Sequence, residues 1–182
     1  ASSITNMPRT FRAHASTTLI ARFFPNKAAM GFLMDRELAH LEPLLKNPKR
    51  PFYAIIGGAK VSSKAGIVKN LLGKLDALFI GGGMAFPFLA AQNILIGCSL
   101  CRETDIPMAK EMIALAQRHG VRLHLPDDIV AGAEGSPVTI FSSGVPFGWT
   151  GMDIGPKTVQ TWSQELQKAA TIYWNGPLGV YE

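Results

Sequence analysis

Short apolar runs alternate with stretches of helical spacing along most of this chain. The run 52–56 ends at Gly57-Gly58 and predicts a buried strand. The stretch that follows predicts a helix, which Ser62 or Ser63 could cap at its N-terminus. The apolar face of that helix consists of Ile67, Val68, Leu71, Leu72 and Leu75. A strand therefore turns through two glycines directly into a helix.

The same pattern recurs further along the chain. Strands are predicted over 75–80, 121–125 and 171–174, and helices over 31–46, 84–92, 104–120 and 156–170. Thr104 could cap the third of these helices, and the last has the apolar positions Val159, Trp162, Leu166 and Ala170. Residues 129–154 are rich in Gly, Ser and Pro, and predict an irregular excursion with a small hairpin through 138–141.

This alternation indicates right-handed crossovers between parallel strands. We predict an α/β fold with a doubly wound, Rossmann-like parallel sheet in three αβα layers, incomplete at the C-terminal end. A sheet of that kind binds its ligands beyond the carboxyl ends of its strands. Four turns rich in Gly, Pro, Asn and Asp are predicted at that rim: 57–58, 81–83, 126–128 and 175–177. Their convergence predicts a ligand site.

The turn after the first strand is the best candidate for binding an anion. It directs backbone N–H groups and the positive end of a helix dipole towards the space above it, where Lys60 and Lys64 add two cations. A phosphate is the expected ligand. The motif is neither a Walker A loop nor Gly-x-Gly-x-x-Gly, so a tight turn with two solvated lysines remains the alternative.

Composition narrows the classes of function. The 182 residues are 47% hydrophobic and 17% charged, which is typical of a globular domain, and no apolar run is long enough to span a bilayer. The formal net charge is +5, but its basic residues are scattered, which disfavours a nucleic-acid groove. Residues 1–34 lack Asp and Glu, so either an organelle transit peptide or an internal segment facing an anion fits them.

Several single residues can be interpreted as functional or as structural. Cys98 and Cys101 form Cys-x-x-Cys, which suits zinc, redox chemistry or an ordinary turn with reduced thiols. Tryptophans 149, 162 and 174 are stacking platforms or, by default, core anchors. His124 is expected to be a half-buried strand residue, and Asp128 to have a structural role at the rim.

Six segments resemble successive motifs of phosphoglycerate kinases, in the order of that family. They are Arg12-Ala-His-Ala-Ser16, Ala29-Met-Gly-Phe-Leu-Met34, Ile55-Ile-Gly-Gly-Ala-Lys-Val-Ser-Ser-Lys64, Ile80-Gly-Gly-Gly-Met-Ala85, Trp149-Thr-Gly-Met-Asp-Ile-Gly-Pro156 and Trp174-Asn-Gly-Pro-Leu-Gly-Val-Tyr-Glu182. The resemblance implies a fragment of a glycolytic, cytoplasmic and monomeric kinase. Residues 1–30 would end the triose-binding domain and connect it to a partial nucleotide-binding domain, residues 31–182.

The resemblance also implies roles for individual residues. The family moves a phosphoryl group between 1,3-bisphosphoglycerate and ADP, giving 3-phosphoglycerate and ATP, with Mg²⁺ on the nucleotide and no nucleic acid or membrane as partner. Lys60 and Lys64 would be the catalytic phosphate ligands, and Arg12 would bind the triose phosphate. The nucleotide would also contact Gly58, Ala59, Gly82, Gly83, Gly151, Asn175, Pro177, Gly179 and Glu182.

The chain departs from the family pattern in places. Phe11 stands where a histidine is usual, Gly132 stands where an aspartate is common, and residues 5–10 fit poorly. The sequence ends before the Gly-Gly-Gly-Asp-Ser/Thr loop that holds Mg²⁺ in the family. We therefore expect this chain by itself to be inactive. A non-catalytic nucleotide-binding homologue or interaction module is the alternative, which Phe11 favours.

Overall fold

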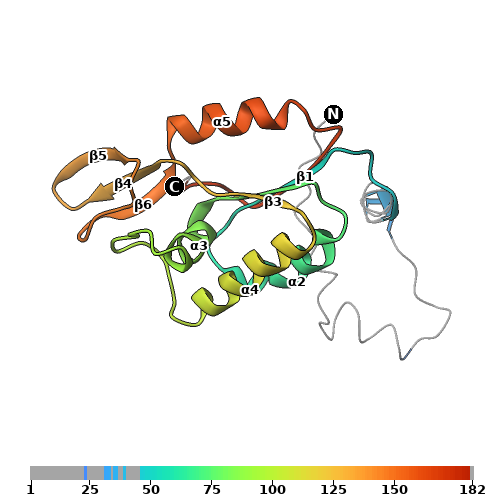
Figure 1. Cartoon of the computed structure of the whole chain (residues 1–182), viewed down its shortest axis with the longest axis horizontal. Helices are drawn as coiled ribbons and strands as arrows, with labels where there is room; N and C mark the ends of the chain where they lie inside the picture. The colour runs from blue at the N-terminus through green and yellow to red at the C-terminus, as the bar shows by residue number, and fades with distance from the viewer. Residues whose placement is uncertain (1–22, 24–30, 34, 37–38, 40–45, 181–182) are drawn as a thin grey trace. The chain divides into compact units, whose positions relative to one another are not determined.

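The computed structural model describes residues 23, 31–33, 35, 36, 39 and 46–180 (Figure 1). The chain divides into two units, Ala1–Pro48 and Lys49–Glu182. In the first unit the described residues 32, 33, 35, 36, 39 and 46 are helical. Most of the helix predicted over 31–46 lies outside the described residues. The domain boundary expected at residue 30 stays a prediction.

The second unit is built on a parallel sheet of four strands. They are β1 (Phe52–Ile56), β2 (Ala77–Ile80), β3 (Arg122–His124) and β7 (Thr171–Asn175), in the spatial order β3-β2-β1-β7. Each strand pairs in parallel with its neighbour, and Ile56 lies beside both Ile80 and Asn175. All four predicted strands are confirmed, as is the α/β fold.

Helices cover both faces of the sheet (Figure 1). Helix α5 (Pro156–Leu166) lies on one face; α2 (Val61–Leu72), α3 (Ala85–Ala91) and α4 (Asp105–Arg118) lie on the other. A 3₁₀ turn, Gly82–Met84, leads into α3. The layers explain why β1 is a continuous apolar run, since every one of its residues is buried. On the α5 face, Tyr53, Ile55 and Phe79 pack with Trp162.

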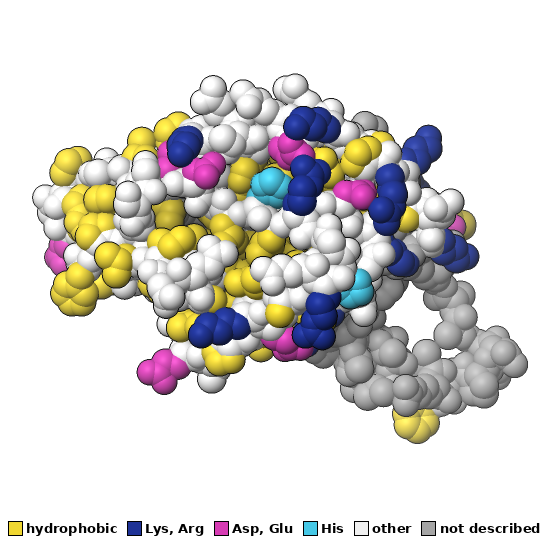
Figure 2. Space-filling model, in the orientation of Figure 1, with side chains coloured by type: hydrophobic (Ala, Val, Ile, Leu, Met, Phe, Trp, Pro, Cys, Tyr) yellow, Lys and Arg dark blue, Asp and Glu magenta, His cyan; other side chains and the backbone are white. Residues whose placement is uncertain are grey.

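The prediction of an irregular excursion over 129–154 is wrong, whereas the small hairpin predicted within it, through 138–141, is confirmed. This segment forms an antiparallel sheet of β4 (Ile129–Ala133), β5 (Ser136–Phe141) and β6 (Thr150–Ile154), in the order β5-β4-β6. Its strands contain residues such as Gly and Ala, which disfavour strands in isolation. Tertiary contacts make up for this and stabilise the strands. Ile129 and Ala131 are buried in a cluster with Phe86. Hydrophobic side chains also gather on the outside of this end of the molecule (Figure 2), among them Val138 and Ile140 of β5.

Two details of the helices differ from the predictions. Lys60 occupies the N-cap of α2 and Thr104 that of α4, but neither side chain caps its helix, and Ser62 and Ser63 lie inside the first turn of α2. Helix α5 ends at Leu166, before Ala170, and Val159 is 49% exposed. The buried positions of α5 are Thr158 and Trp162. Within the described residues, no helix is long and apolar enough to cross a membrane.

Candidate functional site

Three of the predicted rim turns are joined by backbone hydrogen bonds. Gly57 N–H donates to the carbonyl of Asn175 at 2.8 Å, and Gly58 N–H donates to that of Pro177 at 2.9 Å. The carbonyl of Gly58 accepts from Met84 N–H at 2.8 Å. The turns after β1, β2 and β7 therefore form one continuous surface at the carboxyl ends of the strands.

Glycine is required where these turns meet. A Cβ atom on Gly57 would overlap the carbonyl oxygen of Pro177. Gly82 has φ +63°, and a Cβ there would lie 2.8 Å from the same oxygen and 3.0 Å from Gly58 N. The glycines thus allow backbones to approach one another and keep the surface open to a ligand.

A pocket of about 260 Å³ opens over this surface. Seven of the predicted nucleotide contacts line it: Gly58, Ala59, Gly82, Gly83, Gly151, Pro177 and Gly179. Phe86 and Met152 also line it, and a Cβ on Gly151 would overlap the Phe86 ring. A larger hollow of about 540 Å³ lies near Asn93, Asp127 and Phe141, and contains none of the predicted site residues.

Lys64 extends from α2 to the same rim. Its Nζ donates a hydrogen bond to Oδ1 of Asn175, which is only 2% exposed at the end of β7. Lys60 is exposed one turn earlier, and its backbone carbonyl accepts from Ser63 Oγ at 2.8 Å. The first turn of α2 contains no acidic residue and receives no side-chain cap, so its positive end remains suited to an anion.

The prediction from sequence missed four apolar residues of the pocket, the buried Phe86 and three that are exposed. Leu100, Met152 and Val180 line it and are 62%, 41% and 63% exposed. What identifies these three as pocket residues is that their apolar side chains remain exposed. That exposure is known only from the fold, because the loops that carry them are distant in sequence. Ser99, which is buried, accepts a hydrogen bond from Gly151 N–H at 2.9 Å and so holds this wall. Arg12 and Glu182 lie outside the described residues, and their roles stay predictions.

Asp128 lies at the rim, and its carboxylate hydrogen-bonds to the start of α5. Its carboxylate accepts from the N–H groups of Lys157 and Thr158 and from Thr158 Oγ1, at 3.0, 2.8 and 2.6 Å. Burial raises the pKa of Asp128, but these hydrogen bonds outweigh it and lower the pKa below its ordinary value. Gly155 leaves the space that the carboxylate fills. The structural role expected for Asp128 therefore has a definite form: it caps α5 from the loop after β3.

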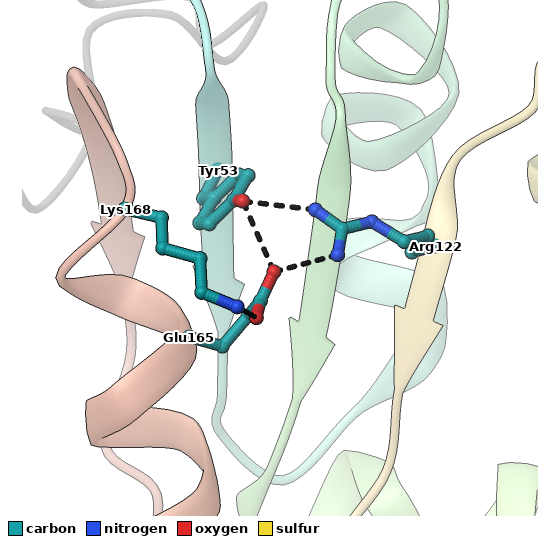
Figure 3. A network of polar contacts seen from close by, with 4 residues as sticks. All are labelled: Tyr53, Arg122, Glu165 and Lys168. Atoms are coloured by element: carbon teal, nitrogen blue, oxygen red, sulfur yellow. Dashed lines mark hydrogen bonds and ion pairs between the residues drawn. The ribbon is translucent and has the colours of Figure 1, made fainter.

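A second polar network lies towards the amino end of β1 (Figure 3). Glu165 accepts from Lys168 Nζ and Arg122 Nη1 at 2.6 Å each, and from Tyr53 Oη at 3.1 Å. Hydrogen bonds from Lys168, then Arg122, lower the pKa of Glu165 to about 2. The network joins α5 to β1 and β3, and its partners saturate the carboxylate, so its role is structural.

His124 and the tryptophans also have structural surroundings. His124 is half-buried and stacks on Phe79 with ring centroids 4.4 Å apart, and burial lowers its pKa. Trp162 is a core residue as expected, and Trp149 packs edge-on against Phe141. Trp174 differs from the expectation, since it is 40% exposed on the outer strand β7.

No cluster of three or more His, Cys, Asp or Glu residues suited to a metal ion occurs among the described residues. On the face seen in Figure 2, Lys and Arg side chains are interspersed with Asp and Glu. The site thus offers the uncapped N–H groups at the start of α2, lysine ammonium groups and a small apolar pocket. This combination suits a ligand with a flat apolar part and an anionic part.

Comparisons with known proteins agree with this geometry. The family model described as phosphoglycerate kinase matches residues 9–182. The chain is 46% identical to the phosphoglycerate kinase of Chloroflexus aggregans over 175 residues, and 50% identical to that of Herpetosiphon aurantiacus over 175 residues. Each alignment covers 94% of this chain, but only 43% and 44% of the relative.

A solved structure leads to the same conclusion. The structure of phosphoglycerate kinase from Coxiella burnetii matches with a TM-score of 0.77 and 37% identity, over 83% of this chain and 40% of that one. The chain therefore spans less than half the length of the relatives that it matches. From its sequence, its sheet and its glycine-lined rim, the chain belongs to the phosphoglycerate kinase family.

Proposed function

We propose that this chain is the nucleotide-binding part of a phosphoglycerate kinase, which transfers a phosphoryl group reversibly between 1,3-bisphosphoglycerate and ADP. The observation that carries the proposal is the position of Lys64 at the same rim as the glycine-lined pocket. Family membership supports the reaction, because the relatives are named for it.

The pocket receives the adenosine part of the nucleotide. Gly82, Gly83 and Gly151 provide flat backbone surfaces, and Leu100, Met152 and Val180 provide apolar contacts around a planar base. Pro177 and Gly179 belong to the same wall. Glu182, which lies outside the described residues, is proposed to accept from the ribose hydroxyls. The phosphates then extend towards the start of α2.

Lys60, Lys64 and the N-terminus of α2 bind the phosphates in this proposal. Phosphoryl transfer needs little covalent chemistry from the protein, so positioning and charge stabilisation supply most of the catalysis. The ammonium group of Lys64 hydrogen-bonds to the side chain of Asn175 at the end of β7. Asn175 is thereby proposed to keep the lysine directed at the rim.

Mg²⁺ accompanies ADP or ATP in the proposed reaction and would neutralise phosphate charge. The described residues do not fit a metal site of their own, since they hold no acidic cluster. Their contribution is therefore to bind the nucleotide. Arg12 is proposed to bind the phosphate of 3-phosphoglycerate or 1,3-bisphosphoglycerate. A monomeric, cytoplasmic enzyme is also part of the proposal, and the two free cysteines agree with a reducing compartment.

Titration of the isotope-labelled 182-residue chain with ADP tests the nucleotide site. We expect NMR shifts at Gly82, Gly83 and Gly151, and weaker binding of adenosine, which lacks the phosphates. The matched control is Gly135, a hairpin glycine that does not line the pocket, whose resonance should not move. Shifts spread evenly over the surface, or none at the three glycines, would contradict the proposal.

A chimera tests the reaction. Residues 9–182 replace the matching segment of the Chloroflexus aggregans protein, and ATP formation from 1,3-bisphosphoglycerate is measured. Turnover is expected. A chimera that melts cooperatively and binds ADP, but shows no turnover, would instead identify the segment as a non-catalytic nucleotide-binding homologue.

A further inference from the structure

Cys98 and Cys101 lie in the loop that forms one wall of the nucleotide pocket. Both are free thiols; Cys98 is exposed and Cys101 is partly exposed. Leu100 lies between them and lines the pocket. Ser99 also lies between them, and its hydroxyl accepts from Gly151 N–H on the same wall. A chemical change at these two cysteines therefore acts on residues that shape the pocket.

The spacing of the two cysteines suits a bond between them. Three residues of chain reach at most about 10 Å, and a disulfide requires Cα atoms about 4.4–6.8 Å apart. The backbone already bends at Leu100, between the two thiols. The N–H of Cys98 is held by the carbonyl of Trp149 at 2.8 Å, so closure draws the Cys101 side of the bend inward. Such closure moves Leu100 relative to Gly151.

The two thiols differ in reactivity. Burial, followed by the nearby charge of Asp105, raises the pKa of Cys101 above its ordinary value. Cys98 is the accessible thiol and reacts first. A metal role is not supported, because a zinc site needs four ligands and no cluster of three or more metal-binding side chains occurs in the described part of the chain.

We propose that Cys98 and Cys101 form a reversible intramolecular disulfide that weakens nucleotide binding in the adjacent pocket. The oxidant is a small-molecule or protein disulfide. The Cys98 thiolate attacks one oxidant sulfur, which forms a mixed disulfide and releases the first oxidant thiol. The Cys101 thiolate then attacks Cys98 Sγ, closes the internal disulfide and releases the second. Two protein thiols are oxidised, one disulfide is reduced to two thiols, and the cysteine protons pass to the leaving thiolates.

The predicted fall in nucleotide affinity rests on the proposed function, whereas formation of the disulfide does not depend on it. Tightening the bend displaces Leu100 from the pocket and strains the hydrogen bond between Ser99 and Gly151. Loss of one such contact corresponds to about a five-fold fall in affinity. Oxidation should therefore lower the affinity for ADP about five-fold or more, and reduction should restore it.

The test uses the 182-residue chain, in which these are the only two cysteines. The chain is equilibrated with oxidised glutathione, and its free thiols and intact mass are measured. ADP affinity is then measured before oxidation, after oxidation and after reduction. Cys98→Ser is the matched control, since it lacks the thiol that reacts first, cannot close the bond and should bind ADP equally well with or without the oxidant.

We expect the loss of both thiols, a mass decrease of about 2 Da and weaker ADP binding in the unsubstituted chain alone. Two persistent thiols, or glutathione retained on Cys98, would overturn the disulfide. A disulfide that leaves ADP affinity unchanged would overturn its coupling to the pocket. If the reduced chain binds no ADP, the proposed function fails together with the coupling, while the thiol count still decides whether the disulfide forms.

Discussion

The ammonium group of Lys64 donates a hydrogen bond to the side-chain oxygen of Asn175, and so joins α2 to the carboxyl end of β7. Lys64→Met should weaken ADP binding about 10- to 100-fold, because a charge-assisted hydrogen bond to a phosphate contributes about 1.5–3 kcal/mol. Lys69→Met is the matched control on the same helix, since Lys69 pairs with Glu111 on the surface. Calorimetric titration measures both. Equal affinities of the two variants for ADP would show that Lys64 does not bind the nucleotide.

Gly57→Ala should destabilise the rim. The added methyl group would overlap the carbonyl oxygen of Pro177, so we expect the free energy of unfolding to fall by about 2–4 kcal/mol. Gly66→Ala is the control, because Gly66 lies inside α2 with no atom near the added methyl group. That change should stabilise the chain by up to about 1 kcal/mol. Urea unfolding of both variants measures the contrast, and loss of stability in both would contradict it.

Glu165→Gln should change the response of the chain to acid. The folded pKa of Glu165, about 2, lies below the ordinary value of 4.5, so its stabilising effect is complete above pH 4.5 and is lost as the pH falls towards 2. The variant should lose about 1–2 kcal/mol at pH 7, and its stability should depend less on pH over that range. Glu111→Gln removes an exposed pair and should cost less than about 0.5 kcal/mol. Unfolding curves at several pH values distinguish the two.

Asp128→Ala should loosen the start of α5. It removes the acceptor for two backbone N–H groups and leaves the buried Thr158 hydroxyl with one fewer partner, at a cost of about 2–3 kcal/mol. Asp127→Ala is the neighbouring control, since Asp127 is exposed and its carboxylate accepts a hydrogen bond from Thr161 Oγ1 at 2.9 Å. Hydrogen exchange at Lys157 and Thr158 should accelerate in the first variant alone. Unchanged exchange there would refute the capping role.

The outer edge of β7 should promote association. Among the described strands none pairs with this edge, and Ile172 and Trp174 on it are 43% and 40% exposed. We expect the 182-residue chain to self-associate as its concentration rises, and Ile172→Lys to reduce this, because a charge on an edge strand opposes pairing. Val159→Lys on helix α5 is the control, because Val159 is exposed and lies on no strand edge. Light scattering measures association, and a monomeric chain with a cooperative melt would contradict the prediction.

Much of the fold could be predicted because local pattern and tertiary burial agree. The continuous apolar run of β1 predicts burial on both faces, and the sheet supplies it. Prediction failed over 129–154, where strands such as β4 contain Gly and Ala and derive their stability from packing on Phe86 and Leu89. It also failed for helix capping, since Lys60 caps nothing and leaves the first turn of α2 open.

By itself, the sequence determined the order of the parallel strands and of the helices between them, the glycine turns at the strand ends and the family. Those features are local, because they follow from periodicity and from residues that few others can replace. Only the tertiary structure decided that Leu100, Met152 and Val180 share a pocket, that Lys64 meets Asn175 and that Asp128 caps α5. Each of these joins segments far apart in the chain, and the spacing of residues within one segment carries no information about such contacts.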